Sequence, residues 1–386
     1  MTGGNAFQWK VALILFGVLF LGVSDTQLVP PLLSTIAGEF HVTPGQAGII
    51  VTSYSLAAAV FALFAGPLSD RIGRKRVLAG GLALFAAASF GTYQVTTLTG
   101  LTVVRTLTGF AAGTLSTCAL SFAGDHYRYS QRGRAMGVLS MAYFLAFVIS
   151  APAGALMAPQ WGWQSVFGTL AILGAAMLVV GLWKLPKTVT AKSSTFVFSS
   201  FGSHFKKPER LAGIVAAFLT SGGLVGYLTY VGAWLANERH IELSRIALIF
   251  ALSGVAAVAA SPLSGWLSDH VGKRNVIIGA NLLLAPVFVI VARLDWGWLL
   301  WIGIAVLGIA ASARQAPLHA LTTEIVGSEI RGEYTAVRNA ASQVGIATAA
   351  FVASRVFDTS RFAGVSIVAA ALTLLIPVTC IWLRER

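Results

Sequence analysis

The stretch GPLSDRIGRKR at residues 66–76 recurs in altered form as GWLSDHVGKR at residues 265–274. The two stretches begin 199 residues apart (265 − 66), and each lies between two long apolar runs. The same spacing aligns further pairs along the chain: Gly109 with Gly308, Asp125 with Glu324, Arg132 with Arg331, and Gly133 with Gly332. One unbroken offset over such different segments indicates an internal duplication and predicts two halves of the same architecture.

The composition favours a membrane protein. Of 386 residues, 56% are hydrophobic and 11% are charged, with a mean hydropathy of +0.78, whereas soluble domains carry roughly 25% charged residues. Twelve apolar runs have about the 20 residues that a membrane span needs, at 9–33, 46–68, 77–96, 99–122, 135–158, 165–185, 210–236, 244–267, 276–293, 297–320, 334–357 and 362–383. The sequence therefore predicts an all-α membrane protein with twelve transmembrane helices in two pseudo-symmetric six-helix bundles.

The longest polar connection predicts the division between the bundles. We expect an N-terminal bundle over residues 1–185, a basic cytoplasmic linker over 186–209 and a C-terminal bundle over 210–386. The first apolar run is too long for a signal-peptide core, and we expect it to be a retained span. The net charge of +13 would suit nucleic acid, but the basic residues stand between apolar runs, so we expect no nucleic acid partner.

Basic residues are distributed unevenly between two alternating sets of loops. One set carries most of them: Arg71, Arg74, Lys75, Arg76, Arg128, Arg132, Arg134, the linker lysines, Lys273, Arg274, Arg331, Arg384 and Arg386. The other set carries few: Arg239, Arg245, Arg293 and Arg361, with Arg355 near a span end. Loops rich in Lys and Arg face the cytoplasm. We therefore expect a bacterial inner-membrane protein with both termini in the cytoplasm and its basic loops against lipid headgroups.

The repeated loop has a physical interpretation residue by residue. Gly66 would let two helices approach closely. Asp70 can accept hydrogen bonds near a helix end and can pair with the arginines that follow it. Gly73 permits a tight turn. The alternative interpretation is a short turn with ordinary cytoplasmic charges, which we favour for Lys75 and Arg76. For Gly66, Asp70, Gly73 and Arg74, recurrence in the second half favours a conformational, gating role.

This loop resembles the signature loop of the major facilitator superfamily, and the resemblance extends over essentially the whole chain. In that family the loop is understood to help latch the outward-open state of a secondary transporter. The resemblance implies a gating role for Asp70 and Arg74. The repeat extends that role to Asp269 and Gly272 in the second half.

Further segments resemble the drug and metabolite exporter branch of that family. Residues 101–109 (LTVVRTLTG) resemble a second signature of the superfamily, an Arg with a following Gly in the fourth span. Residues 25–31 and 227–230 resemble the first and seventh spans of the exporter branch. In the fifth span Pro152 and Gly154 match the branch pattern, but alanines replace its other glycines. The small residues there predict close helix packing and a part in gating.

Asp25 is the only carboxylate well inside any span, about 12 Å from the outer end of its helix at 1.5 Å per residue. Arg105 lies roughly 9 Å deep from the same side. Their similar depth makes pairing plausible, and a carboxylate whose partner moves away can take up a proton. We predict a proton-coupling switch. A fixed structural ion pair is the alternative.

Arg314 should lie in the cytoplasmic half, about 24 Å past the outer start of its span. It is a candidate substrate-binding or gating cation. Snorkelling, or pairing with Glu324, is the alternative. His319, near the same end, is a further candidate substrate contact, with a hydrogen-bonded interfacial histidine and a proton relay as other interpretations.

Aromatic residues recur at helical spacing in the seventh span. Tyr227, Tyr230 and Trp234 share one face at i, i+3 and i+7. We expect the two tyrosines to line an aromatic cavity for an amphiphilic substrate and Trp234 to lie at the membrane interface. Tyr54 and Tyr143 are further candidates for the cavity.

No motif for enzyme chemistry is present. The sequence has no Gly-x-x-x-x-Gly-Lys phosphate loop, His-Glu-x-x-His or Cys-x-x-Cys site, and its loops are too short for a catalytic domain. Cys118 and Cys380 both lie in apolar runs and are interpreted as small hydrophobic residues. We therefore expect no enzyme activity, cofactor or metal, and a chemiosmotic gradient as the energy source.

Three functions fit this sequence. The first is a monomeric, proton-coupled antiporter that exports a small amphiphilic drug, sugar or metabolite. The second is a transporter of an anionic or zwitterionic amphiphile such as a lysolipid, or an organic-anion uptake system, because two cavity arginines face one carboxylate. The third is a transport-dead membrane sensor, against which the complete gating loops in both halves argue.

Overall fold

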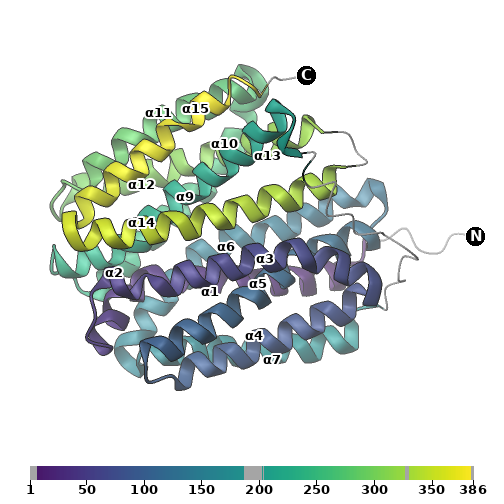
Figure 1. The fold of residues 1–386 in the computed structure, drawn as a ribbon, viewed down its shortest axis with the longest axis horizontal. Helices are drawn as coiled ribbons and strands as arrows, with labels where there is room; N and C mark the ends of the chain where they lie inside the picture. Colours follow the sequence, from purple (N-terminus) through teal and green to yellow (C-terminus); the bar gives the residue numbers. More distant parts are fainter. Residues whose placement is uncertain (1–6, 187–201, 203, 327–329, 384–386) are drawn as a thin grey trace, which may run out of the picture.

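The computed structural model describes residues 7–186, 202, 204–326 and 330–383, and these are almost entirely helical (Figure 1). The helices are α1 (Trp9–Glu39), α2 (Pro44–Ala47), α3 (Ile49–Ile72), α4 (Arg74–Gln94), α5 (Leu98–His126), α6 (Tyr129–Trp161), α7 (Trp163–Lys184), α9 (Pro208–Asn237), α10 (Leu243–Val271), α11 (Lys273–Val291), α12 (Trp298–Ala313), α13 (Gln315–Glu324), α14 (Arg331–Leu374) and α15 (Ile376–Thr379). Most of the predicted linker, residues 187–201 and 203, lies outside the described residues.

Eleven helical segments in the described ranges are long and apolar enough to cross a membrane. One of them, Gly332–Thr379, has 48 residues, more than twice the roughly 20 that one crossing needs. Its main helix α14 bends at Arg361, where φ is 59° and ψ is −166°. It therefore supplies two spans, and the predicted total of twelve is confirmed.

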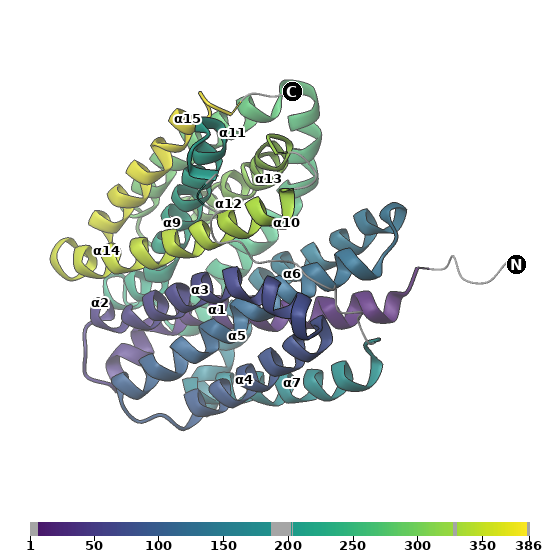
Figure 2. The ribbon, with the colours of Figure 1, turned by 45° about the vertical axis from the view of Figure 1, so that its right-hand side comes forward.

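The helices form two bundles that pack in the same way (Figures 1 and 2). In the first bundle α1 packs on α6, α3 on α5 and α4 on α7. In the second, α9 packs on α14, α10 on α12 and α11 on α14. The bundles meet where α1 contacts α9, α6 contacts α10, and α2 and α3 contact α14.

The 199-residue offset holds for contacts as well as for sequence. Glu39 accepts a hydrogen bond from the Trp163 indole at 2.7 Å, and Glu238, at the equivalent position, accepts one from the Phe362 amide at 3.1 Å. Equivalent residues also bring helices into close contact. A Cβ atom on Gly109 would collide with the Tyr54 carbonyl oxygen, and one on Gly308 with the Ser253 carbonyl oxygen. The duplication predicted from the sequence is therefore visible in the packing of both halves.

The turns at Gly73 and Gly272, and the loop between α5 and α6, lie at one end of the molecule together with the start of α1. We call this the basic end, and the other the opposite end. All described hydrogen bonds between the halves lie toward the opposite end: Ser34 Oγ to Asn237 Oδ1 at 2.5 Å, Thr43 Oγ1 to Asp358 Oδ2 at 2.8 Å, and Gly45 N to Asp358 Oδ1 at 3.2 Å. The two bundles spread apart toward the basic end (Figure 2). Hydrogen bonds therefore close the opposite end, and the helices of the two bundles diverge toward the basic end.

Two local expectations differ from the structure. A Cβ atom on Gly66 would lie 3.8 Å from Thr117 Cγ2, an ordinary contact, so close helix approach does not account for this glycine in the present conformation. Trp234 does not face lipid or water: it is 1% exposed and stacks on Phe362 with ring centroids 4.7 Å apart. It is buried because its face of α9 turns into the second bundle.

Candidate functional site

Asp25 on α1 and Arg105 on α5 form a buried ion pair in the first bundle. Arg105 Nη1 lies 2.7 Å from Asp25 Oδ1, and the two residues are 1% and 0% exposed. Asp25 Oδ2 and Arg105 Nε are buried without a hydrogen-bond partner. The predicted pairing is therefore present. One carboxylate oxygen is left without a donor, so it can hold a proton without breaking another hydrogen bond.

Aromatic rings enclose the arginine of this pair. The guanidinium carbon lies 4.7 Å from the centre of the Tyr54 ring and 5.4 Å from that of Phe167. The Tyr54 hydroxyl donates a hydrogen bond to the Gly22 carbonyl at 3.4 Å. These cation–π contacts stabilise the positive charge where water is excluded. Tyr54 therefore lies beside the ion pair. It is 3% exposed and does not line an open cavity.

Arg314 lies at a break in the tenth span, between α12 and α13. Pro317, three residues later, lacks an amide hydrogen and its ring clashes with the carbonyl four residues before it, which explains the interruption. Arg314 Nη1 donates to Asn281 Oδ1 at 2.7 Å and Nη2 to the Thr220 carbonyl at 3.2 Å. The suggested pairing with Glu324 is wrong, because that carboxylate accepts from Lys273 at 2.6 Å instead.

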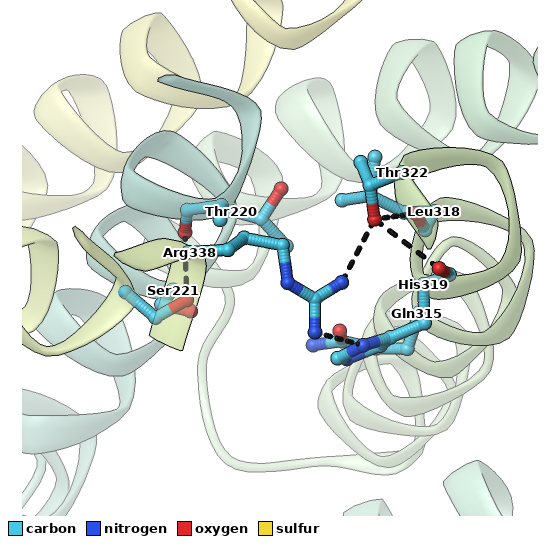
Figure 3. A pocket seen from close by; sticks show the side chains of 9 residues that line it. Thr220, Ser221, Gln315, Leu318, His319, Thr322 and Arg338 are labelled. Carbon is cyan, nitrogen blue, oxygen red and sulfur yellow. Dashed lines mark hydrogen bonds between the residues drawn. The ribbon is translucent and has the colours of Figure 1, made fainter. Parts of the chain in front are cut away.

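Arg338 on α14 is a second buried cation of this half, which the sequence interpretation missed. It is 5% exposed and donates from Nη1 to Thr322 Oγ1 at 2.8 Å and from Nη2 to His319 Nδ1 at 2.5 Å (Figure 3). Its position four residues inside an apolar run resembles that of an interfacial arginine. The repeat offered a signal, because the equivalent residue of the first half is the fully buried Leu139.

The two halves differ in their buried charge. The first half balances Arg105 with Asp25. Neither Arg314 nor Arg338 forms a salt bridge with any described Asp or Glu. A buried charge without a partner costs several kcal/mol. The interior of the second half is therefore electropositive and favours a negatively charged group.

The remaining aromatic candidates lie in different surroundings. Tyr227 is fully buried between Phe288 and Phe362, with ring centroids 4.4 and 4.8 Å away. Tyr230 is also fully buried, and its hydroxyl donates to the Ala350 carbonyl at 3.4 Å. Neither reaches an open space in this conformation, so their contact with substrate stays a prediction.

Tyr143 and His319 are exposed although protein surrounds them. Tyr143 on α6 is 38% exposed, and His319 on α13 is also classed with the exposed residues. His319 lines a small pocket between α9, α13 and α14. A contact of Tyr143 or His319 with substrate stays a prediction.

The sequence profile of the Major Facilitator Superfamily matches residues 14–243 and 213–386. The chain belongs to the Major Facilitator Superfamily. It is 24% identical to a probable sugar efflux transporter of Helicobacter pylori, over 94% of this chain and 91% of that protein. It is 27% identical to the 4-hydroxybenzoate transporter PcaK of Pseudomonas putida, over 74% of this chain and 71% of that protein.

A solved structure shares the fold. A crystal structure of a mutant of the nucleoside transporter NupG superposes with a TM-score of 0.80 at 14% identity, covering 97% of this chain and all of that one. Together with the candidate spans, these similarities identify the chain as a multi-pass membrane transporter of this superfamily.

The superfamily's signature loop forms a charge cluster at the basic end. Arg74 lies 2.6 Å from Asp70 and also pairs with Asp125. In the second half Lys273 and Glu324 repeat the Arg74–Asp125 pair. These pairs join helices within one bundle.

The other candidate gating residues have distinct positions. Gly73 and Gly272 have φ of 99° and 94°, a conformation that favours glycine, which confirms the tight turns. Asp269 is exposed, with no hydrogen bond or salt bridge to another described residue. Pro152 lies within α6, and Gly154 on the same helix packs directly against Leu28. A gating role for each stays a prediction.

Proposed function

We propose that this transporter couples the entry of protons to the export of a small amphiphilic drug, sugar or metabolite. The observation that carries the proposal is the buried Asp25–Arg105 pair with its unpartnered carboxylate oxygen. A rearrangement within the first bundle that displaces Arg105 during the transport cycle leaves a buried carboxylate that must bind a proton or meet water. A single residue can thus exchange a proton as access alternates.

The distribution of basic loops supports placing the basic end in the cytoplasm. On that orientation, the structure has the inward-open arrangement, with the opposite end sealed by Thr43, Ser34 and their partners. A substrate would enter from the cytoplasm or the inner leaflet. The resemblance to a sugar efflux transporter supports the outward direction of transport.

The test is proton movement in proteoliposomes that contain a pH-sensitive dye. A panel of amphiphilic dyes and labelled sugars is added, and at least one is expected to drive proton flux and to be transported faster under a pH gradient. Asp25→Asn is expected to abolish the coupling. Asp295→Asn removes a carboxylate that is 88% exposed at the opposite end and should behave as the wild type. Wild-type transport by Asp25→Asn, insensitive to the gradient, would refute the proposal.

A second candidate function is transport of an anionic or zwitterionic amphiphile. Arg314 favours it, because this fully buried cation has only neutral hydrogen-bond acceptors in the described structure. Arg314→Ala should then lose binding of anionic compounds. If every anionic candidate binds as before, Arg314 does not hold the cargo.

A further inference from the structure

A small pocket lies between α9, α13 and α14, toward the basic end of the second bundle (Figure 3). It is narrow and partly open to solvent. Its polar lining consists of hydroxyl, amide, imidazole and guanidinium groups, from Thr220, Ser221, Gln315, His319, Thr322, Arg338 and Ser342. No lining residue is acidic. The pocket therefore presents one fixed positive charge and no negative one.

The hydrogen bonds of Arg338 determine what the pocket offers to a ligand. A guanidinium can only donate, so His319 Nδ1 must accept from it, and a neutral His319 carries its hydrogen on Nε2. Three of the five guanidinium hydrogens are directed to Thr322, His319 and Asn339. The other two have no partner among the described residues.

A second polar atom in the pocket lacks a partner. The Thr220 hydroxyl is buried without a hydrogen bond, which is unfavourable for a polar group removed from water. The carbonyl of the same residue accepts from Arg314, so a second buried cation lies directly behind this wall of the pocket. The Thr220 hydroxyl has no hydrogen-bond partner, and Arg314 and Arg338 have no acidic partner among the described residues. These two observations point independently to a bound anion.

We propose that this pocket binds the carboxylate group of an amphiphilic organic anion, with Arg338 as its main ligand. A carboxylate is planar, has two acceptor oxygens and no donor, and matches a guanidinium edge. The amide of the same shape would turn an N–H group toward donors. Anion binding at this site does not depend on the proposed transport function. Only the statement that the anion is the transported cargo rests on that function. The exposed His319 marks the side from which the anion enters.

The experiment measures binding in detergent solution at pH 7.5 by calorimetry, so that neither a gradient nor transport is required. The probes are benzoate, phenylacetate and octanoate, each compared with its amide, and phenyl phosphate. At least one carboxylate is expected to bind ten-fold or more tightly than its amide, and phenyl phosphate more weakly than phenylacetate. If no carboxylate binds better than its amide, or if phenyl phosphate binds best, the carboxylate site is refuted.

Variants separate binding from folding. Arg338→Gln should lower carboxylate affinity at least ten-fold and leave amide affinity unchanged, and Arg338→Lys should restore part of the loss. Thr220→Val should weaken the carboxylate two- to ten-fold. The matched control is Arg355→Gln, the same change at an exposed position of the same helix. If Arg338 has only a structural role, Arg338→Gln should lower the melting temperature but keep the wild-type ratio of carboxylate affinity to amide affinity. That outcome would overturn the proposal.

These outcomes are independent of proton coupling. Loss of carboxylate preference in Arg338→Gln with intact coupling through Asp25 supports the site alone. Coupling that fails in Asp25→Asn while the wild type shows no carboxylate preference would refute the site and leave the proposed function standing.

Discussion

Asp358 in the second half accepts a hydrogen bond from Thr43 in the first half, across 315 residues of sequence. The other carboxylate oxygen of Asp358 accepts from the amide of Gly45, and Thr43 also caps the start of α2. One side chain thus joins the N-cap and the first turn of α2 to α14. No other described carboxylate bridges the halves, so this contact is the main polar closure of the opposite end.

Removing this closure should shift the transporter toward opening at the opposite end. Asp358→Ala deletes two hydrogen bonds to a partly hydrated charge, together worth about 1–2 kcal/mol, or roughly ten-fold in the ratio of the two states. Spin labels at Thr96→Cys and Arg293→Cys, both exposed at that end, would report the change as a longer distance. Cys118 and Cys380 are buried and should not react.

Two further variants define this effect. Thr43→Val removes one of the two hydrogen bonds to Asp358 together with the cap of α2, and should shift the distance in the same direction. Asp295→Ala, which removes a highly exposed carboxylate at the same end, should give none. Identical distance distributions for Asp358→Ala and the wild type would contradict a closing role.

The buried ion pair should make stability depend on pH when one partner is removed. In Arg105→Ala the Asp25 carboxylate is buried without its cation, a loss of about 3–5 kcal/mol. Proton uptake removes that charge in the folded variant, whereas the unfolded chain keeps it hydrated. The free energy of unfolding, relative to the wild type, should therefore fall as the pH rises.

Thermal unfolding between pH 5 and pH 8 measures this dependence. The deficit of Arg105→Ala should be small at pH 5 and largest at pH 8. The double variant Asp25→Asn/Arg105→Ala should lose the additional pH dependence. A deficit that is the same at both pH values would show that Asp25 is not the group responsible.

Helix packing at Gly109 should tolerate no side chain. The added methyl of Gly109→Ala would meet the Tyr54 carbonyl and separate α3 from α5, at a cost of about 1–3 kcal/mol. Gly308→Ala should behave alike in the second half. In Gly80→Ala the methyl has no neighbour within 4 Å, so this variant should unfold at or above the wild-type temperature. Equal melting temperatures for Gly109→Ala and Gly80→Ala would rule out the tight contact.

At the bend of α14, glycine should adopt the backbone conformation of residue 361 at a lower free-energy cost than arginine. Arg361, with φ of 59°, occupies the position equivalent to Gly162, whose φ is 80°. Non-glycine residues in such a conformation cost about 1–3 kcal/mol. Arg361→Gly should therefore raise the melting temperature, and Gly162→Ala should lower it. A lower melting temperature for Arg361→Gly would indicate that the arginine side chain stabilises the bend by other contacts.

The sequence predicted the features that depend on local composition and repetition. Long apolar runs, the loop at residues 66–76 and its repeat were sufficient for the spans, the turns at Gly73 and Gly272, and the duplicated packing. The pairing of Asp25 with Arg105 was also predictable, because charges at equal depth in neighbouring spans have few other partners.

The features that were missed depend on tertiary surroundings. Arg338 lies near the end of its run, where an arginine can reach water, and only the packing of α9 and α13 around it shows that it is buried. The break at Arg314 could be predicted from Pro317, but an argument from membrane depth alone does not take that proline into account.

The uncompensated arginines have an electrical consequence. A cell interior is negative, and moving one elementary charge across 100 mV is worth about 2.3 kcal/mol. If a monoanion held at Arg338 leaves while one proton enters through Asp25, both movements carry current in the same direction. The membrane voltage then contributes about 4.6 kcal/mol per cycle at 100 mV, twice the contribution for a neutral cargo. Such a transporter would concentrate its cargo outside even without a pH difference.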